Sequence, residues 1–388
     1  MLVLALISLA IWLVLLLGRG GFWCADQWLS DPPSGAGPGR GAWPGVVAVV
    51  PARNEADVIE RSLGSLLKQN YPGDLRIVLV DDHSDDGTGT IAAALAGGAE
   101  RLTVLQAQPL PAGWSGKLWA VNQGVAHARA VAPEACYLLL TDADIAHDSG
   151  SVRRLVAKAE SERLDLVSLM ALLEARGFWG RLLIPAFVFF FQKLYPFRWV
   201  NDPGARTAGA AGGCILIRRE TLDGIGGIER IRTALIDDCT LGAAVKAGYN
   251  GRRGLIWLGL TRTVISLRPY PNLDDVWTMV ARTAFTQLRH STLLLAGAVA
   301  GMVCTYLAAP LAVLGWPIHG DPRAAAVGLV VWFLIMVCYR PTLRLYGQPV
   351  AAGALLPLVG VLYSLMTVDS ALRHWRGQGG MWKGRVQG

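Results

Sequence analysis

This chain contains long apolar runs near its two ends and short apolar runs between them, and the two kinds of run predict different elements. Long runs occur at the start, in MLVLALISLAIWLVLLL, and in three segments near the end, at about 293–316, 324–339 and 349–368. Runs of this length are typical of helices that lie in or cross a membrane. Between them, short β-branched runs end at polar loops, which indicates strands followed by helices.

Two strand-loop-helix units follow each other in the first half of the chain. The strand 46–50 leads into the loop PARNE and a helix that Glu55 or Asp57 could open. The strand 77–80 leads into VDDHSDDGT and a helix from Thr90. Successive units of this kind predict an α/β fold with a doubly wound, Rossmann-like parallel sheet, which binds ligands at the carboxyl ends of its strands.

A third apolar strand, 138–141, ends at Asp142 and Asp144. Side chains two positions apart on a strand share a face, so both carboxylates can reach one cation. Hard divalent ions such as Mg²⁺ and Mn²⁺ take oxygen ligands, often one or two carboxylates plus substrate phosphates. We therefore expect a divalent metal here, although a surface loop can also carry such a pair without function.

Composition points to a membrane protein rather than a nucleic-acid-binding protein. Hydrophobic residues make up 53% of the 388 residues, more than ordinary soluble domains contain. The net charge of +7 is scattered, without a long Lys/Arg run or a nucleic-acid-binding motif, so anionic lipids and a phosphate-bearing substrate account for it. The six cysteines lack zinc spacing and are expected to be free thiols.

These patterns divide the chain into five expected parts. They are a transmembrane anchor at 1–18, a Pro/Gly-rich linker at 19–45, a catalytic domain at 46–290, a transmembrane region of about three helices at 291–370, and a basic tail at 371–388. Within the catalytic domain, the apolar segment near 178–200 is interpreted as an interfacial or re-entrant helix, with a buried helix or a true span as alternatives. Arg340 and Arg344 mark the loop after the second C-terminal segment as cytoplasmic.

Five motifs stand in an order and spacing that resemble the large inverting GT-A glycosyltransferase family. They are PARNE (51–55), VDDHSDDGT (80–88), GWSGKLWAVNQG (113–124), TDAD (141–144) and LIDDCTLG (235–242). Within this family 2 type, the chain most resembles the hopanoid-biosynthesis-associated (hopene-associated) glycosyltransferases, and next the carotenoid glycosyltransferases that share GWxGK. The resemblance covers about residues 46–289.

The resemblance implies a metal-dependent hexosyltransferase that moves a sugar from a UDP-sugar to a hydroxyl of a polyisoprenoid-derived lipid. It implies an integral inner (cytoplasmic) membrane protein whose catalytic domain faces the cytoplasm. The nucleotide-sugar-binding residues that it implies are Pro51, Ala52, Arg53, Glu55, Asp82, Lys117, Asn122 and Asp142. The Asp82 carboxylate can accept a uracil N–H, and the first loop is expected to offer free backbone N–H groups near the phosphates. A turn-capping Asp82 and an ordinary solvated Lys117 are the alternatives.

By the same resemblance, Asp238 is the catalytic base and Asp237, which replaces a more common glutamate, has an orienting role. The alternative is that either aspartate caps the helix 239–247. The residues implied for the acceptor or diphosphate region are Gly212, Gly213, Gln287 and Arg289. The segment ARTAFTQLRHS matches the QxxRW motif of processive synthases poorly, which argues against a polymerase.

Other functions remain open from the sequence. The acceptor could instead be a carotenoid, a polyprenyl phosphate or a diacylglycerol, and a non-catalytic membrane scaffold is a further alternative. A nicotinamide-dependent dehydrogenase is disfavoured, because no GxGxxG follows the first strand. Neither the sugar nor the oligomeric state follows from these patterns.

Overall fold

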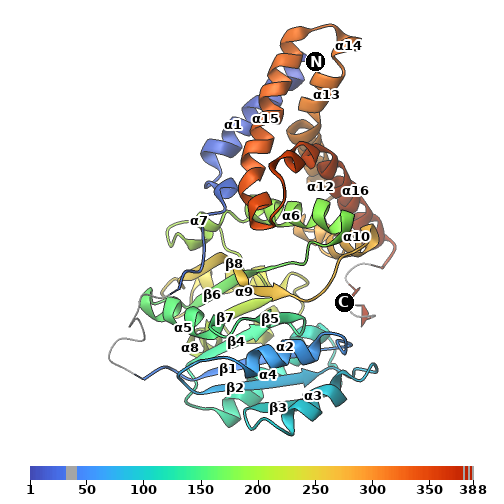
Figure 1. Cartoon of the computed structure of the whole chain (residues 1–388). Coiled ribbons are helices and arrows are strands. Elements are labelled where there is room, and N and C mark those ends of the chain that lie inside the picture. The colour runs from blue at the N-terminus through green and yellow to red at the C-terminus, as the bar shows by residue number, and fades with distance from the viewer. Residues whose placement is uncertain (32–41, 379–380, 383–384, 387–388) are drawn as a thin grey trace. The chain divides into compact units, whose positions relative to one another are not determined.

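The computed structural model describes residues 1–31, 42–378, 381–382 and 385–386. Its elements form two compact units, drawn together in Figure 1. The helical unit comprises Met1–Ala25, Ala175–Arg198 and Pro269–Gly380. The sheet unit comprises Asp26–Glu174, Trp199–Arg268 and Met381–Gly388. Each unit is thus assembled from stretches that are far apart in the sequence.

An eight-stranded sheet forms the centre of the sheet unit, in the spatial order β3-β2-β1-β4-β7-β6-β8-β5. The strands are β1 (Val46–Ala52), β2 (Leu75–Asp81), β3 (Leu102–Gln106), β4 (Tyr137–Thr141), β5 (Ile145–His147), β6 (Leu166–Leu172), β7 (Cys214–Arg218) and β8 (Ile256–Ser266). Strands β3, β2, β1 and β4 are parallel, as are β6 and β8. The predicted α/β, Rossmann-like fold is confirmed.

The prediction of a parallel sheet is wrong in one respect. Strand β7 runs antiparallel to both of its neighbours, β4 and β6, and β5 runs antiparallel to β8. After β6 the chain leaves the sheet unit and returns at Trp199, so β6 and β7 are not joined by the right-handed crossover that parallel strands require. The sheet is therefore mixed.

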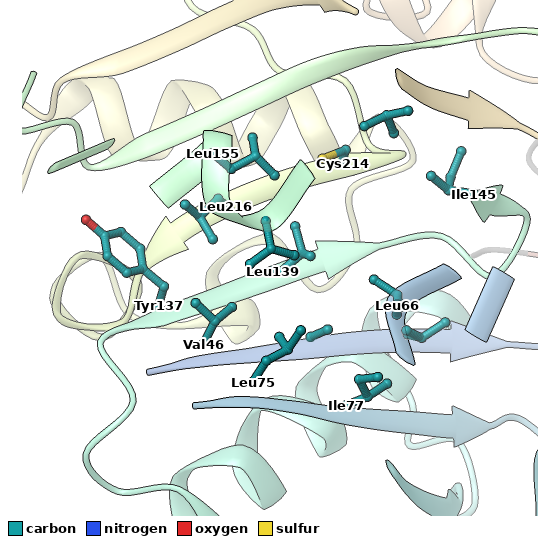
Figure 2. Packing of buried hydrophobic residues seen from close by; sticks show 14 of the residues in the cluster. Val46, Leu66, Leu75, Ile77, Tyr137, Leu139, Ile145, Leu155, Cys214 and Leu216 are labelled. Carbon is teal, nitrogen blue, oxygen red and sulfur yellow. The ribbon is translucent and has the colours of Figure 1, made fainter. Parts of the chain in front are cut away.

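Helices cover both faces of the sheet. They are α2 (Ile59–Leu67), α3 (Thr88–Ala96), α4 (Gly116–Val131), α5 (Ser151–Ser161), α8 (Arg219–Gly224), the short 3₁₀ helix η2 (Ile228–Ile231) and α9 (Asp237–Ala247). Figure 2 shows the core on one face, where Leu66 of α2 and Leu155 of α5 point toward the strands. Alternate residues of β1, such as Val46 and Val50, belong to this core, whereas their neighbours point to the opposite face.

Helix α4 packs against the other face, and Gly124 allows its close approach. A Cβ atom at Gly124 would lie 2.4 Å from Cγ1 of Val49 and 3.2 Å from Cγ2 of Val80. The absence of a side chain at this position brings α4 directly onto β1 and β2. Ser115 begins the helix, and its hydroxyl accepts a hydrogen bond from the N–H of Leu118. The position of α4 matters because it carries Lys117.

The helical unit contains three helices that are long and apolar enough to cross a membrane, at Thr292–Leu314, Pro322–Leu345 and Val350–Trp375. Its elements are α1 (Leu2–Gly18), η1 (Phe22–Cys24), α6 (Gly177–Leu194), α10 (Leu273–Ala281), α11 (Ala284–Gln287), α12 (Thr292–Met302), the π-helical η3 (Val303–Leu307), α13 (Ala308–Leu314), α14 (Trp316–His319), α15 (Pro322–Leu345), η4 (Val350–Leu355) and α16 (Leu356–Trp375). The three C-terminal helices agree with the sequence-based expectation.

Several expected boundaries differ from the structure. Helix α1 has 17 residues and spans roughly 26 Å, slightly less than a bilayer core of about 30 Å. Helix α15 continues to Leu345, so Arg340 and Arg344 lie within the helix rather than in a loop. The expected tail 371–388 begins inside α16, which ends at Trp375.

The segment 178–200 overlaps most of α6 and of α7 (Phe197–Asn201), and the sequence boundary between the two units falls within α7. Part of the expected linker, residues 32–41, and residues 379–380, 383–384 and 387–388 of the tail lie outside the described residues. A short ladder joins β9 (Met381–Trp382) and β10 (Arg385–Val386).

The buried carboxylate of Asp165, just before β6, links several segments of the sheet unit by hydrogen bonds. The Asp165 side chain, 2% exposed, accepts hydrogen bonds from two guanidinium nitrogens of Arg252 at 2.7 and 3.1 Å. It also accepts from the N–H of Leu255 at 2.7 Å and the hydroxyl of Thr221 at 2.8 Å. Burial alone would raise the pKa of Asp165, but these hydrogen bonds and the Arg252 charge lower it below its ordinary value.

Replacing Asp165 by Asn is expected to lower the free energy of unfolding by about 1–3 kcal/mol at neutral pH, because the four hydrogen bonds lose their charged acceptor. Since the pKa of Asp165 is lowered by folding, its contribution is present above about pH 4 and is lost as the pH falls further. Thermal unfolding of both forms in detergent across this pH range measures the difference. The control is Asp223→Asn, which removes only a solvent-exposed pair with Arg129. An equal effect of the two changes would contradict the assignment.

Candidate active site

The predicted acidic residues converge at the carboxyl edge of β1 and β4, next to the beginnings of α4 and α9. A small cavity opens there, lined among others by Pro51, Lys117, Asp142, Gly212, Asp237 and Asp238. All of these residues belong to the sheet unit. Residues separated by almost 190 positions in the chain are therefore brought to one place by the sheet topology.

Lys117 is the central charge of this cavity. Its ammonium lies 2.8 Å from a carboxylate oxygen of Asp142 and 3.1 Å from one of Asp237. Only a fifth of the side chain is exposed. Burial would lower the pKa of Lys117, but the charges of Asp142, Asp237 and Asp238 raise it above its ordinary value, so the side chain stays protonated. The alternative of an ordinary solvated lysine does not describe this environment.

Both carboxylate oxygens of Asp238 accept hydrogen bonds from backbone N–H groups. Oδ2 accepts a hydrogen bond from the N–H of Gly212 at 2.9 Å, and Oδ1 accepts from the N–H of Cys239 at 2.7 Å. Burial and the neighbouring Asp237 charge raise the pKa of Asp238 to about 6, against the opposing effect of these N–H groups and Lys117. Helix α9 begins at Asp237 after Ile236, so neither aspartate is its N-cap residue, although Oδ1 of Asp238 accepts from the first-turn N–H of Cys239.

A second cluster of opposite charges lies at the same strand ends, around Arg268. Its Nε atom donates to Oδ2 of Asp144 at 3.0 Å, and its Nη2 atom donates to both carboxylate oxygens of Glu55 at 2.8 and 2.9 Å. Arg268 follows β8, and the N–H of Leu267 donates to the carbonyl of Asp144. The guanidinium group thus joins the first loop to the TDAD loop.

The expectation of free backbone N–H groups in the first loop is wrong for three residues. The N–H of Asn54 donates to the hydroxyl of Ser84, that of Glu55 to the hydroxyl of Thr88, and that of Ala56 to a carboxylate oxygen of Asp86. The side chains of the DDHSDDGT loop therefore satisfy these groups. Glu55 also does not open α2, which begins at Ile59, because its carboxylate faces Arg268.

Asp82 is buried behind this loop and is paired with Arg53. A carboxylate oxygen lies 3.7 Å from Nη1 of Arg53, and the same nitrogen donates to the Asp82 carbonyl. The N–H of Asp82 donates to the carbonyl of Ala52, which ends β1. The structure therefore brings together three of the residues that the sequence suggests for the nucleotide, Ala52, Arg53 and Asp82, of which Arg53 is the least buried, with 15% of its side chain exposed.

The other predicted residues are divided between the two units. Asn122 is on α4, five positions beyond Lys117, and does not line the cavity. The Gly213 carbonyl accepts a hydrogen bond from the hydroxyl of Thr141, the last residue of β4, next to Asp142. Gln287 and Arg289 belong to the helical unit, where the Gln287 amide nitrogen lies 2.8 Å from the Tyr195 hydroxyl.

The two TDAD carboxylates fit a divalent cation that takes its remaining ligands from a substrate. Asp142 and Asp144 offer oxygen atoms of the kind such an ion takes as ligands. Burial, together with the charge of Asp144, raises the pKa of Asp142 against the attraction of Lys117. Within residues 1–31 and 42–378, no group of three or more acidic, His or Cys side chains is arranged to hold a metal. This donor set is typical of a Mg²⁺ or Mn²⁺ site that is completed by phosphate oxygens and water.

Comparison with protein families finds a match for part of this chain. Residues 47–226 match the family model described as Glycosyl transferase family 2. This match identifies a family 2 glycosyltransferase domain in the chain, and the sheet unit has the corresponding GT-A fold. None of the curated proteins compared with the chain matches it.

Among solved structures, the chain is similar to the mannosyltransferase PcManGT from Pyrobaculum calidifontis, determined in complex with GDP-Man and Mn²⁺. The two are 19% identical, the similarity covers 97% of this chain and 99% of that chain, and the TM-score is 0.52. Glucosyl-3-phosphoglycerate synthase from Mycobacterium tuberculosis in complex with Mn²⁺, UDP-Glc and phosphoglyceric acid is 20% identical, covers 68% and 86% of the two chains, and has a TM-score of 0.43. The first similarity establishes a shared fold.

Sequence reasoning missed Arg268, which lies 124 positions from Asp144 and 213 from Glu55. Replacing Arg268 by Gln is expected to lower the free energy of unfolding by about 1–3 kcal/mol, because the buried Glu55 carboxylate loses a charged donor. Thermal unfolding at neutral pH measures this. Arg262→Gln, at an exposed position of the preceding strand β8, is the control and should change stability little. Indistinguishable melting of the two variants would show that Arg268 does not join the loops.

Proposed function

We propose that this protein is a membrane-bound, inverting glycosyltransferase that moves a sugar from a UDP-sugar to a hydroxyl of a polyisoprenoid-derived lipid, with a role in hopanoid biosynthesis. The observation that carries the catalytic part is Asp238, a carboxylate fixed by two backbone N–H groups beside the Lys117 ammonium. The resemblance of five ordered motifs carries the lipid part.

Asp238 is suited to act as a general base. A base must accept the proton of the acceptor hydroxyl as its oxygen attacks the anomeric carbon from the face opposite the leaving nucleotide. The two backbone N–H groups hold the carboxylate in one orientation. A pKa of about 6 leaves Asp238 largely ionised at neutral pH while making it a stronger base than an ordinary aspartate. Asp237 orients Lys117 and raises the basicity of its neighbour.

Lys117 and Arg268 are proposed to meet the donor diphosphate. Lys117 already lies within ion-pair distance of Asp142, so it can offset charge that develops on a leaving group at the same place. A divalent ion held by Asp142 and Asp144 would supply Lewis-acid stabilisation of that charge. PcManGT, which shares the fold, was solved with a nucleotide sugar and Mn²⁺, which supports this class of donor and metal.

The nucleobase is proposed to lie near Arg53 and Asp82. A buried carboxylate can accept an imide N–H of uracil, and Arg53 lies between this carboxylate and solvent. Because PcManGT was solved with GDP-Man, a guanine donor is the alternative that the experiment must include. We place the catalytic unit on the cytoplasmic side of the inner membrane, where nucleotide sugars are made.

The decisive experiment offers UDP-sugars and GDP-sugars to the detergent-purified full chain with Mn²⁺ and measures nucleoside diphosphate release, with and without hopanoid lipid. We expect release from a UDP-sugar that depends on both metal and lipid and is lost in Asp144→Ala. If nucleoside diphosphate is released only with a carotenoid, a polyprenyl phosphate or a diacylglycerol, that lipid replaces the hopanoid lipid as the proposed acceptor. A folded chain that binds no nucleotide would favour the scaffold alternative.

Asp238→Asn is expected to reduce transfer by about 10²–10⁴-fold or more, because the general base is removed, while nucleotide binding stays close to that of the native chain. Calorimetry of nucleotide binding, run beside the release assay, separates the two effects. The matched control is Asp223→Asn on the exposed surface. Loss of nucleotide binding in Asp238→Asn would contradict the role of base.

The transfer rate is expected to fall as the pH drops below about 6, because Asp238 becomes protonated. Asp237→Asn removes a charge that raises the pKa of Asp238, so the acid limb of the kcat/KM profile should move to lower pH. A pH profile of both forms measures this. An acid limb that stays in place, or moves to higher pH, would show that Asp238 does not control it.

A further inference from the structure

A lysine in the helical unit lies among aromatic rings rather than acidic groups. Lys193 is on the last turn of α6, and its ammonium lies 5.1 Å from the ring centre of Phe190 and 4.7 Å from that of Tyr306. Both rings are buried. Lys193 forms no ion pair with any carboxylate in the part of the chain that the structure describes. An ammonium in such surroundings favours an anionic partner.

Around the Lys193 ammonium and the Tyr306 hydroxyl, hydrogen-bond donors outnumber the acceptors that the described residues provide. The ammonium donates to the Tyr306 hydroxyl at 3.0 Å, which leaves two of its three protons without a described acceptor. The Tyr306 hydroxyl proton also has no acceptor among the described side chains and carbonyls. Tyr306 itself is fully buried, so its hydroxyl holds the ammonium in place rather than meeting a ligand. The two remaining ammonium protons of the partly exposed Lys193 suit the oxygens of a phosphate group.

The surrounding backbone holds these two side chains in place. Tyr306 lies on η3, a π-helical turn between α12 and α13, and the Trp12 indole of α1 donates to the neighbouring Thr305 carbonyl at 2.7 Å. π-Helical turns often occur at functional sites. Arg19, just after α1, donates to the carbonyls of Lys193 and Leu194 at 3.1 and 3.2 Å. A second positive charge is thereby fixed next to Lys193.

The charge of the whole helical unit favours the same kind of ligand. Its three stretches contain twelve Lys and Arg residues but only four acidic residues, Asp274, Asp275, Asp321 and Asp369. This excess is larger than the net charge of the entire chain, so the remainder of the chain carries no positive excess. Basic groups at the ends of apolar helices attract anionic lipids.

We propose that Lys193 and Tyr306 form a binding site for the phosphate group of an anionic membrane lipid. The Lys193 ammonium donates to phosphate oxygens, the buried Tyr306 hydroxyl holds the ammonium in position, Arg19 adds positive charge, and the apolar helices contact the acyl chains. The proposal concerns the helical unit alone and does not depend on the identity of the glycosyl acceptor.

Native mass spectrometry of the detergent-purified full chain tests the site, with dioleoyl phosphatidylglycerol, dioleoyl phosphatidylcholine and sodium phosphate as separate probes. We expect phosphatidylglycerol to bind about tenfold more tightly than phosphatidylcholine, and Lys193→Met to remove most of this preference, since a charge-assisted hydrogen bond is lost. Lys193→Arg, which keeps the charge, should restore binding in part.

Two matched controls keep the test specific. Arg323→Gln removes the same charge from an exposed position of the same unit. Tyr339→Phe removes a second buried tyrosine hydroxyl, one without a hydrogen-bond partner among the residues that the structure describes. Both should bind phosphatidylglycerol as the native chain does, whereas Tyr306→Phe, which keeps the ring contacts and should fold, should weaken binding several-fold, about as expected for one hydrogen bond.

Three results would overturn the proposal. They are equal binding of the two lipids by the native chain, unchanged lipid preference in Tyr306→Phe, and binding of sodium phosphate that excludes phosphatidylglycerol. The last result would identify a site for free phosphate rather than for a lipid.

Discussion

The ammonium group of Lys117 is the charge on which the candidate active site depends. It lies within ion-pair distance of Asp142, from the end of β4, and of Asp237, from the first turn of α9. Without a cation between them, carboxylates gathered in a partly buried cavity would repel one another or take up protons. The position of the ammonium depends in turn on α4, which reaches the sheet closely because residue 124 has no side chain. A packing contact on the sheet face therefore sets the geometry of the charges at its edge.

The site contains more negative than positive groups, and this imbalance is informative. Lys117 faces the carboxylates of Asp142, Asp237 and Asp238, and Arg268 faces those of Glu55 and Asp144. Structural ion pairs usually balance, because an uncompensated buried charge costs several kcal/mol or more. The raised pKa of Asp238, about 6, is one consequence of this surplus. A cluster that is incompletely neutralised by the protein itself is suited to a site where further cationic charge arrives with the substrate.

Much of the fold and about half of the site could be predicted from the sequence, for identifiable reasons. Strands that end at carboxylates are local patterns, so Asp142 and Asp144 could be placed at a sheet edge without knowledge of their partners. The antiparallel direction of β7 could not, because it depends on where the chain returns from the helical unit. Arg268 gave no local signal, since its two partners are far away in the sequence. Nor does composition reveal which loop satisfies the backbone N–H groups of the PARNE loop.

The net positive charge of the chain is concentrated in the helical unit, and this distribution has a physical explanation. The sheet unit gathers carboxylates at one edge and offsets them with single, well-placed cations, whereas the helical unit is strongly basic. A soluble catalytic domain gains little from a large positive charge, since self-repulsion opposes the compact state. Helices in contact with anionic head groups gain attraction from the same charge, about 1 kcal/mol for each basic residue near the surface. The net charge of +7 is thus better understood as the property of one unit than of the chain as a whole. This separation suits the function proposed above, in which a basic helical unit meets anionic lipids and a carboxylate-rich site lies in the sheet unit.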